Sequence, residues 1–194
     1  MKKRYLIAGL GNPGKEYAYT RHNAGFMLAD RLANHWGWSW RTEKKFFAEI
    51  AEGSVAGKSV MLCKPRTFMN NSGDAVGALS SFQRIEPADV LVVVDDADLP
   101  LGTLRMRPEG SPGGHHGLES VEAHLGSRAY PRIRLGVARP DQGVRDIANH
   151  VLGRFSAEEL VIWEKVLARS VEQAETWLND GLARAMNLSN GSVG

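Results

Sequence analysis

The chain has 194 residues, a length that suits one domain with its own core. Hydrophobic residues make up 43% and charged residues 24% of it, as in ordinary globular proteins, and no apolar run reaches the roughly 18 residues that a membrane-spanning helix needs. From the length and the hydropathy we expect one domain over residues 1–194 and no contact with a membrane. The chain has a single cysteine, Cys63, which excludes an internal disulfide, so we expect a cytoplasmic protein. Cys63 lies in the apolar run of residues 60–63, which favours a buried structural thiol over a nucleophile.

The net charge of +2 is unevenly distributed along the chain. Lys and Arg outnumber Asp and Glu in residues 1–66 and 103–145, whereas acidic residues predominate in residues 67–102 and 146–194. Basic segments separated by an acidic one indicate a polyanion partner at one face of the protein. Ordinary variation of surface charge is the alternative.

The first half of the chain predicts strands alternating with helices. The apolar run of residues 4–10 stops at Gly11, too early for the core of a signal peptide, and is typical of a buried strand. The further expected elements are a helix over residues 24–35 capped by Asn23, strand-like spacing at Trp36, Trp38 and Trp40, a hairpin of residues 46–51 and 58–64 around residues 54–57, and a helix from Asn70 or Asn71 to about Phe82.

The second half continues the same alternation. The expected elements are a buried strand over residues 90–94, an alternating strand over 103–107, a short helix over 117–125 and a strand over 132–137. Ser156 and Glu159 then form a capping box in front of a helix with helical apolar spacing as far as Leu178, and Gly181 can end that helix. Strands mixed with helices predict an α/β sheet with helices on its faces.

A glycine pattern after the first strand resembles a dinucleotide-binding fingerprint. Gly9, Gly11 and Gly14 match G-x-G-x-x-G, but no helix is expected to begin within the pattern. Asp30, at the spacing of a ribose-binding acid, falls inside the expected helix instead of at a strand end. The glycines therefore indicate a tight turn or a close backbone approach, and an NAD-dependent oxidoreductase remains only as an alternative.

Polar residues follow the ends of several expected strands. They are Asn12, His22, Asn70, Asp95, Asp96, Asp98, His115 and His116. If the strands are parallel in one sheet, these residues meet at one edge. A histidine there can take a proton from water, a carboxylate can orient the imidazole, and asparagine amides can donate to a carbonyl oxygen as it gains charge. Solvated surface residues and a Mg²⁺ site at the three aspartates are the alternatives.

Four segments in register resemble the signatures of bacterial-type peptidyl-tRNA hydrolases. They are residues 9–17 with 20–25, residues 68–73, residues 95–102 and residues 113–118, and the similarity runs from about Arg4 to Met186. The resemblance implies a single α/β domain with a mixed central sheet and helices on both faces. It implies a monomer that hydrolyses the ester bond of peptidyl-tRNA without a metal or another cofactor.

The resemblance also implies roles for matching residues. His22 would be the general base and Asp95 would orient it, while Asn12 and Asn70 would hold the tRNA 3′ end and the ester carbonyl. The further substrate-binding residues would be Tyr17, Phe68, Met69, His115 and His116. Simple packing is the alternative for Tyr17, Phe68 and Met69.

Two arginine pairs alternate along expected strands, so the members of each pair point to one face. The pairs are Arg105 with Arg107 and Arg132 with Arg134, and the resemblance implies that such residues contact the phosphates of the tRNA acceptor end.

His116 departs from the family pattern, because the family has Asn at that place. A histidine beside His22 adds a titratable group to the site and predicts an extra inflection in the pH–rate profile. A ring turned outward is the alternative. The same departure leaves open a non-catalytic RNA-binding relative that keeps the groove but has lost turnover.

Overall fold

The computed structural model describes residues 2–138 and 146–194, and its centre is one mixed sheet in the order β2-β3-β4-β1-β5-β7-β6-β8. The strands are β1 (Arg4–Gly9), β2 (Arg41–Glu43), β3 (Ala48–Val55), β4 (Lys58–Pro65), β5 (Val90–Asp96), β6 (Thr103–Arg107), β7 (Arg132–Gly136) and β8 (Gly191–Ser192). The α-helices are α1 (Ala24–Trp36), α2 (Ser72–Gln83), α3 (His116–Leu125), α4 (Ile147–Val151), α5 (Ala157–Asp180) and α6 (Leu182–Ser189). Short 3-10 helices include η1 (Arg21–Asn23), η2 (Lys44–Phe46), η3 (Met69–Asn71) and η4 (Pro87–Asp89).

The four central strands run in the same direction. β1 pairs in parallel with β4 and with β5, and β5 pairs in parallel with β7. The outer strands β2, β3, β6 and β8 join by antiparallel pairing. The segments that leave the carboxyl ends of β1, β4 and β5 therefore meet at one edge of the sheet, as the sequence predicted.

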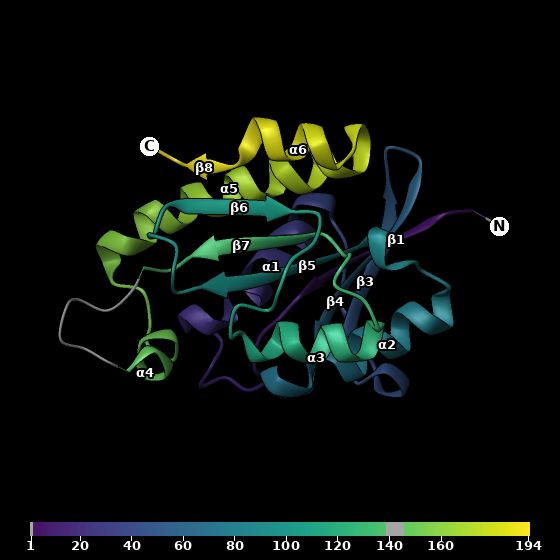
Figure 1. Ribbon diagram of the computed structural model, residues 1–194, viewed down its shortest axis with the longest axis horizontal. Helices are drawn as coiled ribbons and strands as arrows, with labels where there is room; N and C mark the ends of the chain where they lie inside the picture. The colour runs from purple at the N-terminus through teal and green to yellow at the C-terminus, as the bar shows by residue number, and fades with distance from the viewer. Residues whose placement is uncertain (1, 139–145) are drawn as a thin grey trace.

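Helices cover both faces of the sheet, as expected (Figure 1). On β5, Leu91 and Val93 point into the core with α1 and α5, whereas Val92 and Val94 point into the core with α2 and α3. This alternation follows from the opposite orientation of successive side chains in a strand. The second of these cores includes Cys63, whose thiol is fully buried. Burial raises the pKa of Cys63 to about 12, so it is a structural thiol and not a nucleophile.

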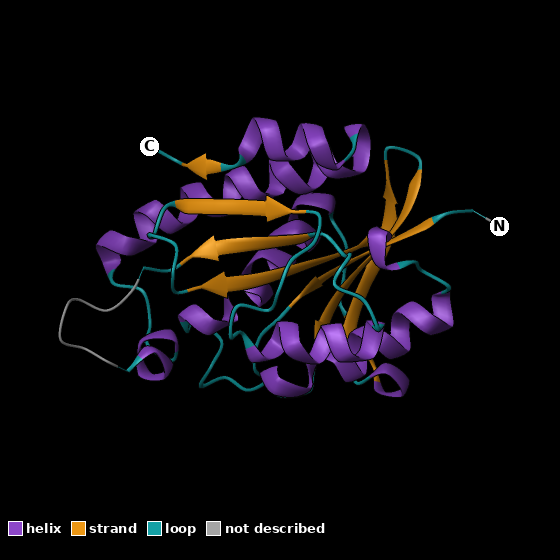
Figure 2. Cartoon of the chain, in the orientation of Figure 1, coloured by secondary structure: helices purple, strands orange, loops and turns teal. Residues whose placement is uncertain are grey.

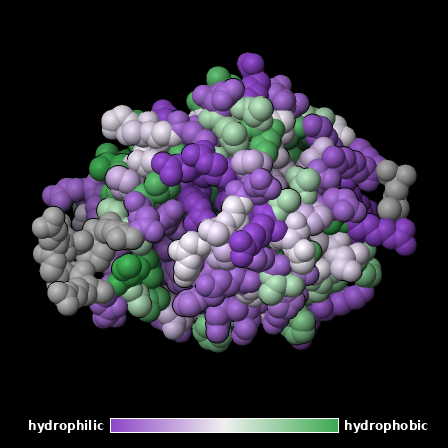
Figure 3. All heavy atoms as spheres, viewed as in Figure 1, coloured by the Kyte–Doolittle hydropathy of each residue, from purple (hydrophilic) through white to green (hydrophobic). Residues whose placement is uncertain are grey.

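One part of the sheet carries helices on only one of its two faces. The cartoon view shows β6 and β7 uncovered on the side of α2 and α3 (Figure 2). Arg105 and Arg107 project from β6 into solvent, and Arg105 pairs across the ladder with Arg134 of β7. Hydrophilic side chains gather over this part of the molecule (Figure 3). The open face is therefore basic and lies beside the carboxyl edge of the parallel strands.

Most expected elements are present within one or two residues of their predicted bounds, but two local predictions were wrong. Trp36, Trp38 and Trp40 do not form a strand, because Gly37 ends α1 in a left-handed conformation (φ 70°) and β2 begins only at Arg41. Asn23 precedes α1 without capping it. The short elements β2, α4, α6 and β8 were not predicted from the sequence, because a few residues carry only weak periodicity.

The glycines of the apparent dinucleotide fingerprint serve helix packing. A Cβ on Gly9 would lie 2.1 Å from the carbonyl oxygen of Gly25, and a Cβ on Gly25 would lie 2.4 Å from the amide nitrogen of Leu10. These two glycines let the start of α1 approach β1 at backbone distance. No helix begins within residues 9–14, so the geometry of a dinucleotide-binding turn is absent there.

Candidate active site

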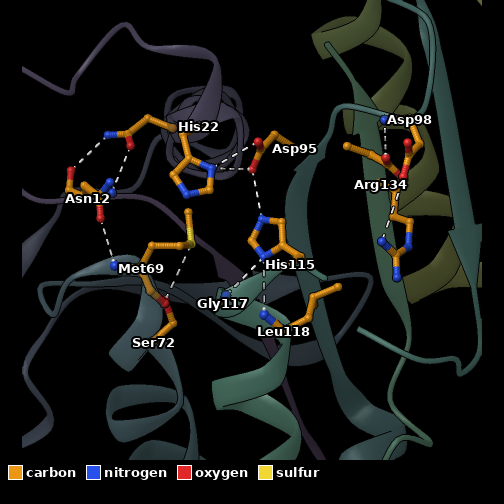
Figure 4. A network of polar contacts seen from close by, with 12 residues as sticks. Asn12, His22, Met69, Ser72, Asp95, Asp98, His115, Gly117, Leu118 and Arg134 are labelled. Carbon is orange, nitrogen blue, oxygen red and sulfur yellow. Dashed lines mark hydrogen bonds and ion pairs between the residues drawn. The ribbon is translucent and has the colours of Figure 1, made fainter. Parts of the chain in front are cut away.

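A pocket of about 460 Å³ opens at the carboxyl edge of the parallel strands. Its lining comprises His22, the segment Asp95–Asp98, the segment Gly113–His116, Arg134, and Ile147, Ala148 and Val151 of α4. One wall is therefore polar and the α4 wall is apolar. Figure 4 shows His22 and His115 approaching Asp95 from two sides.

His22 and Asp95 form a close polar contact in this pocket. His22 lies in η1, and its Nδ1 is 3.0 Å from both carboxylate oxygens of Asp95, which ends the buried part of β5. Asp95 is only 3% exposed, whereas the His22 side chain is 19% exposed. The imidazole thus has one nitrogen held by a buried carboxylate and one edge open to the pocket.

His115 binds the same carboxylate and is held in one tautomer. It caps α3, where its Nδ1 accepts hydrogen bonds from the amides of Gly117 and Leu118 at 3.1 and 3.4 Å. An accepting Nδ1 carries no proton, so the proton of the neutral ring is on Nε2. That Nε2–H donates to Asp95 Oδ1 at 3.0 Å. The backbone of α3 therefore determines that His115 is a donor to Asp95.

This arrangement leaves Nε2 of His22 as the free base of the pocket. An ionised carboxylate only accepts hydrogen bonds, so His22 presents Nδ1–H to Asp95 and keeps the lone pair on Nε2. No hydrogen bond within the described part of the chain engages that Nε2. Chemically, the arrangement suits proton abstraction from a water molecule beside His22.

The charge of Asp95 is maintained by its two histidine partners. Burial by itself would raise the pKa of Asp95, but the hydrogen bonds from His115 and His22 outweigh burial and lower the pKa to about 2. Asp95 is therefore ionised at neutral pH and can stabilise a protonated His22. Asp96, next in the chain, differs: burial raises its pKa, and the opposing charge of Arg134 only partly offsets this.

Asn12 lies across from His22 and is rigidly held. Its Oδ1 accepts from the amide of Met69 at 2.8 Å, which turns its Nδ2 away from Met69. Its backbone is held by Asn23, whose fully buried side chain accepts from the Asn12 amide at 2.8 Å and donates to its carbonyl oxygen at 2.9 Å. Among the described residues no partner takes the Nδ2 donor of Asn12, so it can donate to a ligand. This role of Asn23 was not predicted, because its place before α1 indicated a helix cap.

Apart from His115 and His116, the expected binding residues, Asn12 included, are not among the residues that line the pocket. Met69 is 4% exposed and contributes its backbone amide to Asn12, while its side chain packs in the core. Tyr17, Phe68 and Asn70 do not line the pocket. Phe68 is 55% exposed, and Asn70 is also exposed beside it on the turn that leads into α2. These two side chains lie free for a ligand that extends beyond the pocket.

His116 lines the pocket rim but points into solvent. Its side chain is 75% exposed, and its Nδ1 lies 3.1 Å from Glu119 Oε2, one turn along α3. This placement favours the alternative in which the ring is turned outward. His115, by contrast, is the inner histidine of the pair.

Of the four expected phosphate contacts, Arg132 has a different role. It is 1% exposed, and its guanidinium donates to the carbonyl oxygens of Arg128, Tyr130 and Gly110. Burial lowers its pKa from the ordinary value. We therefore correct the prediction for Arg132: its guanidinium is buried and binds the neighbouring loops, so it is not presented to a phosphate at the surface. The other three arginines, Arg105, Arg107 and Arg134, remain on the open face.

The three aspartates do not form the metal site considered above. Within the described ranges, metal-ligating groups come together at His22, Asp95 and His115. However, the capping bonds to Nδ1 of His115 place a proton on the Nε2 that would have to bind the metal. Asp96 accepts from the Asp98 amide at 2.8 Å and lies 3.7 Å from Arg134. The hydrogen-bonding pattern thus favours a proton-transfer site over a metal site.

The chain is similar to known proteins over nearly its whole length. The family model described as "Peptidyl-tRNA hydrolase" matches residues 6–193. A peptidyl-tRNA hydrolase of Synechococcus sp. (strain JA-3-3Ab) is 51% identical over 185 residues, covering 95% of this chain and 82% of the relative. A peptidyl-tRNA hydrolase of Bacillus cytotoxicus is 45% identical, covering 95% of this chain and 98% of the relative.

Solved structures agree with the sequence matches. A crystal structure of peptidyl-tRNA hydrolase from Acinetobacter baumannii superposes with a TM-score of 0.92 at 33% identity, covering 100% of this chain and 98% of that one. The mixed sheet, the helices on its faces and the single domain are therefore those of that structure. No helix within the described ranges has the length and apolar character needed to cross a membrane.

Proposed function

Since the chain belongs to the peptidyl-tRNA hydrolase family and hydrolyses the ester bond of peptidyl-tRNA, we propose that His22 is the general base that activates the attacking water. The observation that carries this proposal is the contact of His22 Nδ1 with both oxygens of Asp95 at 3.0 Å, which leaves Nε2 facing the pocket as an acceptor. Asp95 in turn is kept ionised and in place by His115.

The proposed reaction needs only these groups and water. Nε2 of His22 takes a proton from water as the water oxygen attacks the ester carbonyl, and Asp95 stabilises the imidazolium that forms. The carbonyl oxygen gains negative charge and accepts from the Nδ2 of Asn12. When the tetrahedral intermediate collapses, the bond to the ribose oxygen breaks, and His22 returns its proton to that oxygen. The products are free tRNA and a peptide with a new carboxylate.

The groups outside the pocket are proposed to hold the rest of the substrate. Tyr17, Phe68 and Asn70 would contact the 3′ end of the tRNA or the peptide beside Asn12. An aromatic side chain as exposed as Phe68 offers a face on which a base or an apolar side chain can stack. We further propose that the protein acts in the cytoplasm, because its substrate arises in translation, and that it does so as a monomer, as the family resemblance implies.

The open basic face is proposed to bind tRNA phosphates through Arg105, Arg107 and Arg134. Replacing each by Ala should reduce the salt dependence of tRNA binding by roughly one unit of slope for each phosphate that is no longer neutralised. KM should rise more than kcat falls, because these arginines hold substrate and transition state equally. The measurement is tRNA affinity against salt concentration.

The matched control for these variants is Arg41→Ala. Arg41 is also on a strand and about half exposed, but it lies on β2 at the opposite end of the sheet order. It should leave the salt slope unchanged. An unchanged slope in the three arginine variants together would place the tRNA elsewhere.

His116→Asn tests the departure from the family pattern. Because the His116 ring is exposed and paired with Glu119, we expect the two profiles of kcat/KM against pH to have the same shape. The measurement is kcat/KM from about pH 5 to 9 for both proteins, which spans the ordinary pKa of histidine. An inflection that disappears in the Asn variant would show that the ring turns inward when substrate binds.

A non-catalytic RNA-binding relative was the alternative that His116 left open, and the outward placement of that ring gives it no support. The intact set of His22, Asp95 and Asn12 and the family membership favour the hydrolase. The two candidates separate in one assay, the release of free tRNA from N-acyl-aminoacyl-tRNA in excess over protein. Many turnovers per molecule support the hydrolase, whereas binding without release supports the alternative.

A further inference from the structure

The residue before His22 makes an unusual set of contacts for a surface-loop arginine. Arg21 has a 12% exposed side chain, and its Nη1 donates to the carbonyl oxygen of His150 at 3.2 Å. Its Nη2 lies 3.0 and 3.3 Å from the two carboxylate oxygens of Glu159. The Arg21 backbone amide also donates to the carbonyl oxygen of Gly153 at 2.9 Å. One residue of the η1 turn is thus tied to α4, to the loop that follows α4 and to the first turn of α5, a stretch (residues 150–159) called the α4–α5 segment below.

The residues that surround the Arg21 guanidinium are already oriented for this contact. Glu159 accepts from the Ser156 amide as part of the capping box of α5, so its carboxylate is already oriented when it meets Arg21. Burial works to raise the pKa of Glu159, but the Ser156 hydrogen bond and the charge of Arg21 outweigh it, so its pKa lies below the usual value. A Cβ on Gly153 would lie 2.8 Å from Arg21 Nη1, so the absence of a side chain there leaves room for the guanidinium.

Both sequence neighbours of His22 are held by hydrogen bonds, Arg21 on its N-terminal side and Asn23 on its C-terminal side. His22 stands between Arg21, which binds the α4–α5 segment, and Asn23, which binds the backbone of Asn12 on the β1 loop. α4 itself supplies the apolar wall of the pocket. The position of His22 relative to Asp95 and to that wall therefore depends on both neighbours.

We propose that Arg21 is a positioning residue for His22, and that the Glu159 carboxylate and the His150 carbonyl are its anchors. The inference rests on the proposed role of His22 as the base. Arg21 does not touch the reacting atoms in this role. It limits the rotation of the η1 turn, and a displacement of about 1 Å in a catalytic group can cost roughly a hundredfold in rate.

The test compares Arg21→Met, Gly153→Ala and the double variant. Arg21→Met keeps the aliphatic stem and removes both anchors, and we expect kcat to fall about tenfold or more with little change in KM. Gly153 has no positive φ that would strain an Ala there. Gly153→Ala keeps both charged residues, but its Cβ would lie 2.8 Å from Arg21 Nη1 and 3.2 Å from the carbonyl oxygen of His150, so the guanidinium has to shift relative to that anchor. It should lower kcat in the same way. In the Arg21→Met background it should have no further effect, because the group it displaces is gone.

The control is Arg31→Met. It removes an arginine of α1, the neighbour of η1, that also pairs with a glutamate of α5, Glu164, without touching Arg21 or Glu159, and it should leave kcat unchanged. All variants are measured where circular dichroism shows them folded. Arg21→Lys, which can reach one anchor at a time, should restore part of the lost kcat.

Several results would overturn the proposal. Wild-type kcat in folded Arg21→Met would remove Arg21 from positioning. A rise in KM and a lower salt slope at unchanged kcat would make Arg21 a phosphate contact. Multiplicative effects of the two substitutions would show that they act separately. A wrong assignment of His22 as the base can be told apart from a wrong role of Arg21. In the first case His22→Ala would retain its turnover, independently of the results for the Arg21 variants.

Discussion

His22→Ala is expected to lower kcat by roughly 10²–10⁴-fold, the usual contribution of a general base, while tRNA affinity stays near that of the unchanged protein. The substitution removes the nitrogen that accepts the proton from water and leaves the basic face of Arg105, Arg107 and Arg134 intact. The measurement is the release of free tRNA from N-acyl-aminoacyl-tRNA, with tRNA affinity determined separately on the same preparation.

The matched control is His35→Ala. His35 lies at the end of α1, is 49% exposed and binds Glu175 of α5, so it is an imidazole–carboxylate pair outside the pocket. It should leave kcat unchanged. If His22→Ala keeps most of its turnover, His22 is not the base and the proposed mechanism fails.

Asp95→Asn has the second-largest expected effect, a loss of kcat smaller than that of His22→Ala. The physical reason is the tautomer of His22. His115 must donate its Nε2–H, because α3 holds its Nδ1 as an acceptor. The oxygen of the new side-chain amide would therefore face His115, and the NH₂ group of that amide would face Nδ1 of His22. That donor selects the tautomer with the proton on Nε2, where the lone pair is needed.

The outcome for Asp95→Asn is read from kcat at the pH optimum. Part of the activity should survive, since the imidazole is still present and the favourable tautomer is disfavoured but not removed. Wild-type activity would exclude Asp95 from the mechanism. As a control for burial, the variant should remain folded at neutral pH by circular dichroism.

The same variant should also change the response of stability to acid. The pKa of Asp95 is lowered to about 2 in the folded protein, against an ordinary value of 3.8. Such a group stabilises the fold at pH values above its unfolded pKa, and this stabilisation is lost as the pH falls from about 4 towards 2. Asn does not titrate, so the loss of unfolding free energy over that range should be smaller by about 2 kcal/mol. Urea denaturation at several pH values measures the difference.

Local patterns were enough to place most helices and strands. The capping box of Ser156 and Glu159 is present with both of its hydrogen bonds, and Gly181 follows the end of α5. The apolar run of residues 90–94 forms the first five residues of β5, and all of them are buried. These features depend on residues near one another in the chain, so the interactions that determine them can be recognised in a short segment of sequence.

The direction of individual side chains could not be read in the same way. Asn23 looked like a helix cap, but its side chain binds the backbone of Asn12, because the close packing of Gly9 against Gly25 brings the two loops together. Arg132 alternated with Arg134 as expected, yet a neighbouring loop covers Arg132 and leaves Arg134 at the pocket. The two-residue period of a strand determines which face of the sheet a side chain points to, but it does not determine whether another part of the chain covers that side chain.

The order of polar residues along the chain was sufficient to include His22 and Asp95 in a larger set expected at one sheet edge, because parallel strands carry their following loops to the same side. The resemblance to the hydrolase family singled out these two residues from that set. Which nitrogen of each histidine carries the proton was decided only by packing. The start of α3 points its amides at His115 Nδ1, which leaves the proton of that ring on Nε2, and the ionised carboxylate of Asp95 accepts both this Nε2–H and the Nδ1–H of His22. Those donors come from segments far apart in sequence, so the chemistry that distinguishes the two histidines exists only in the folded chain.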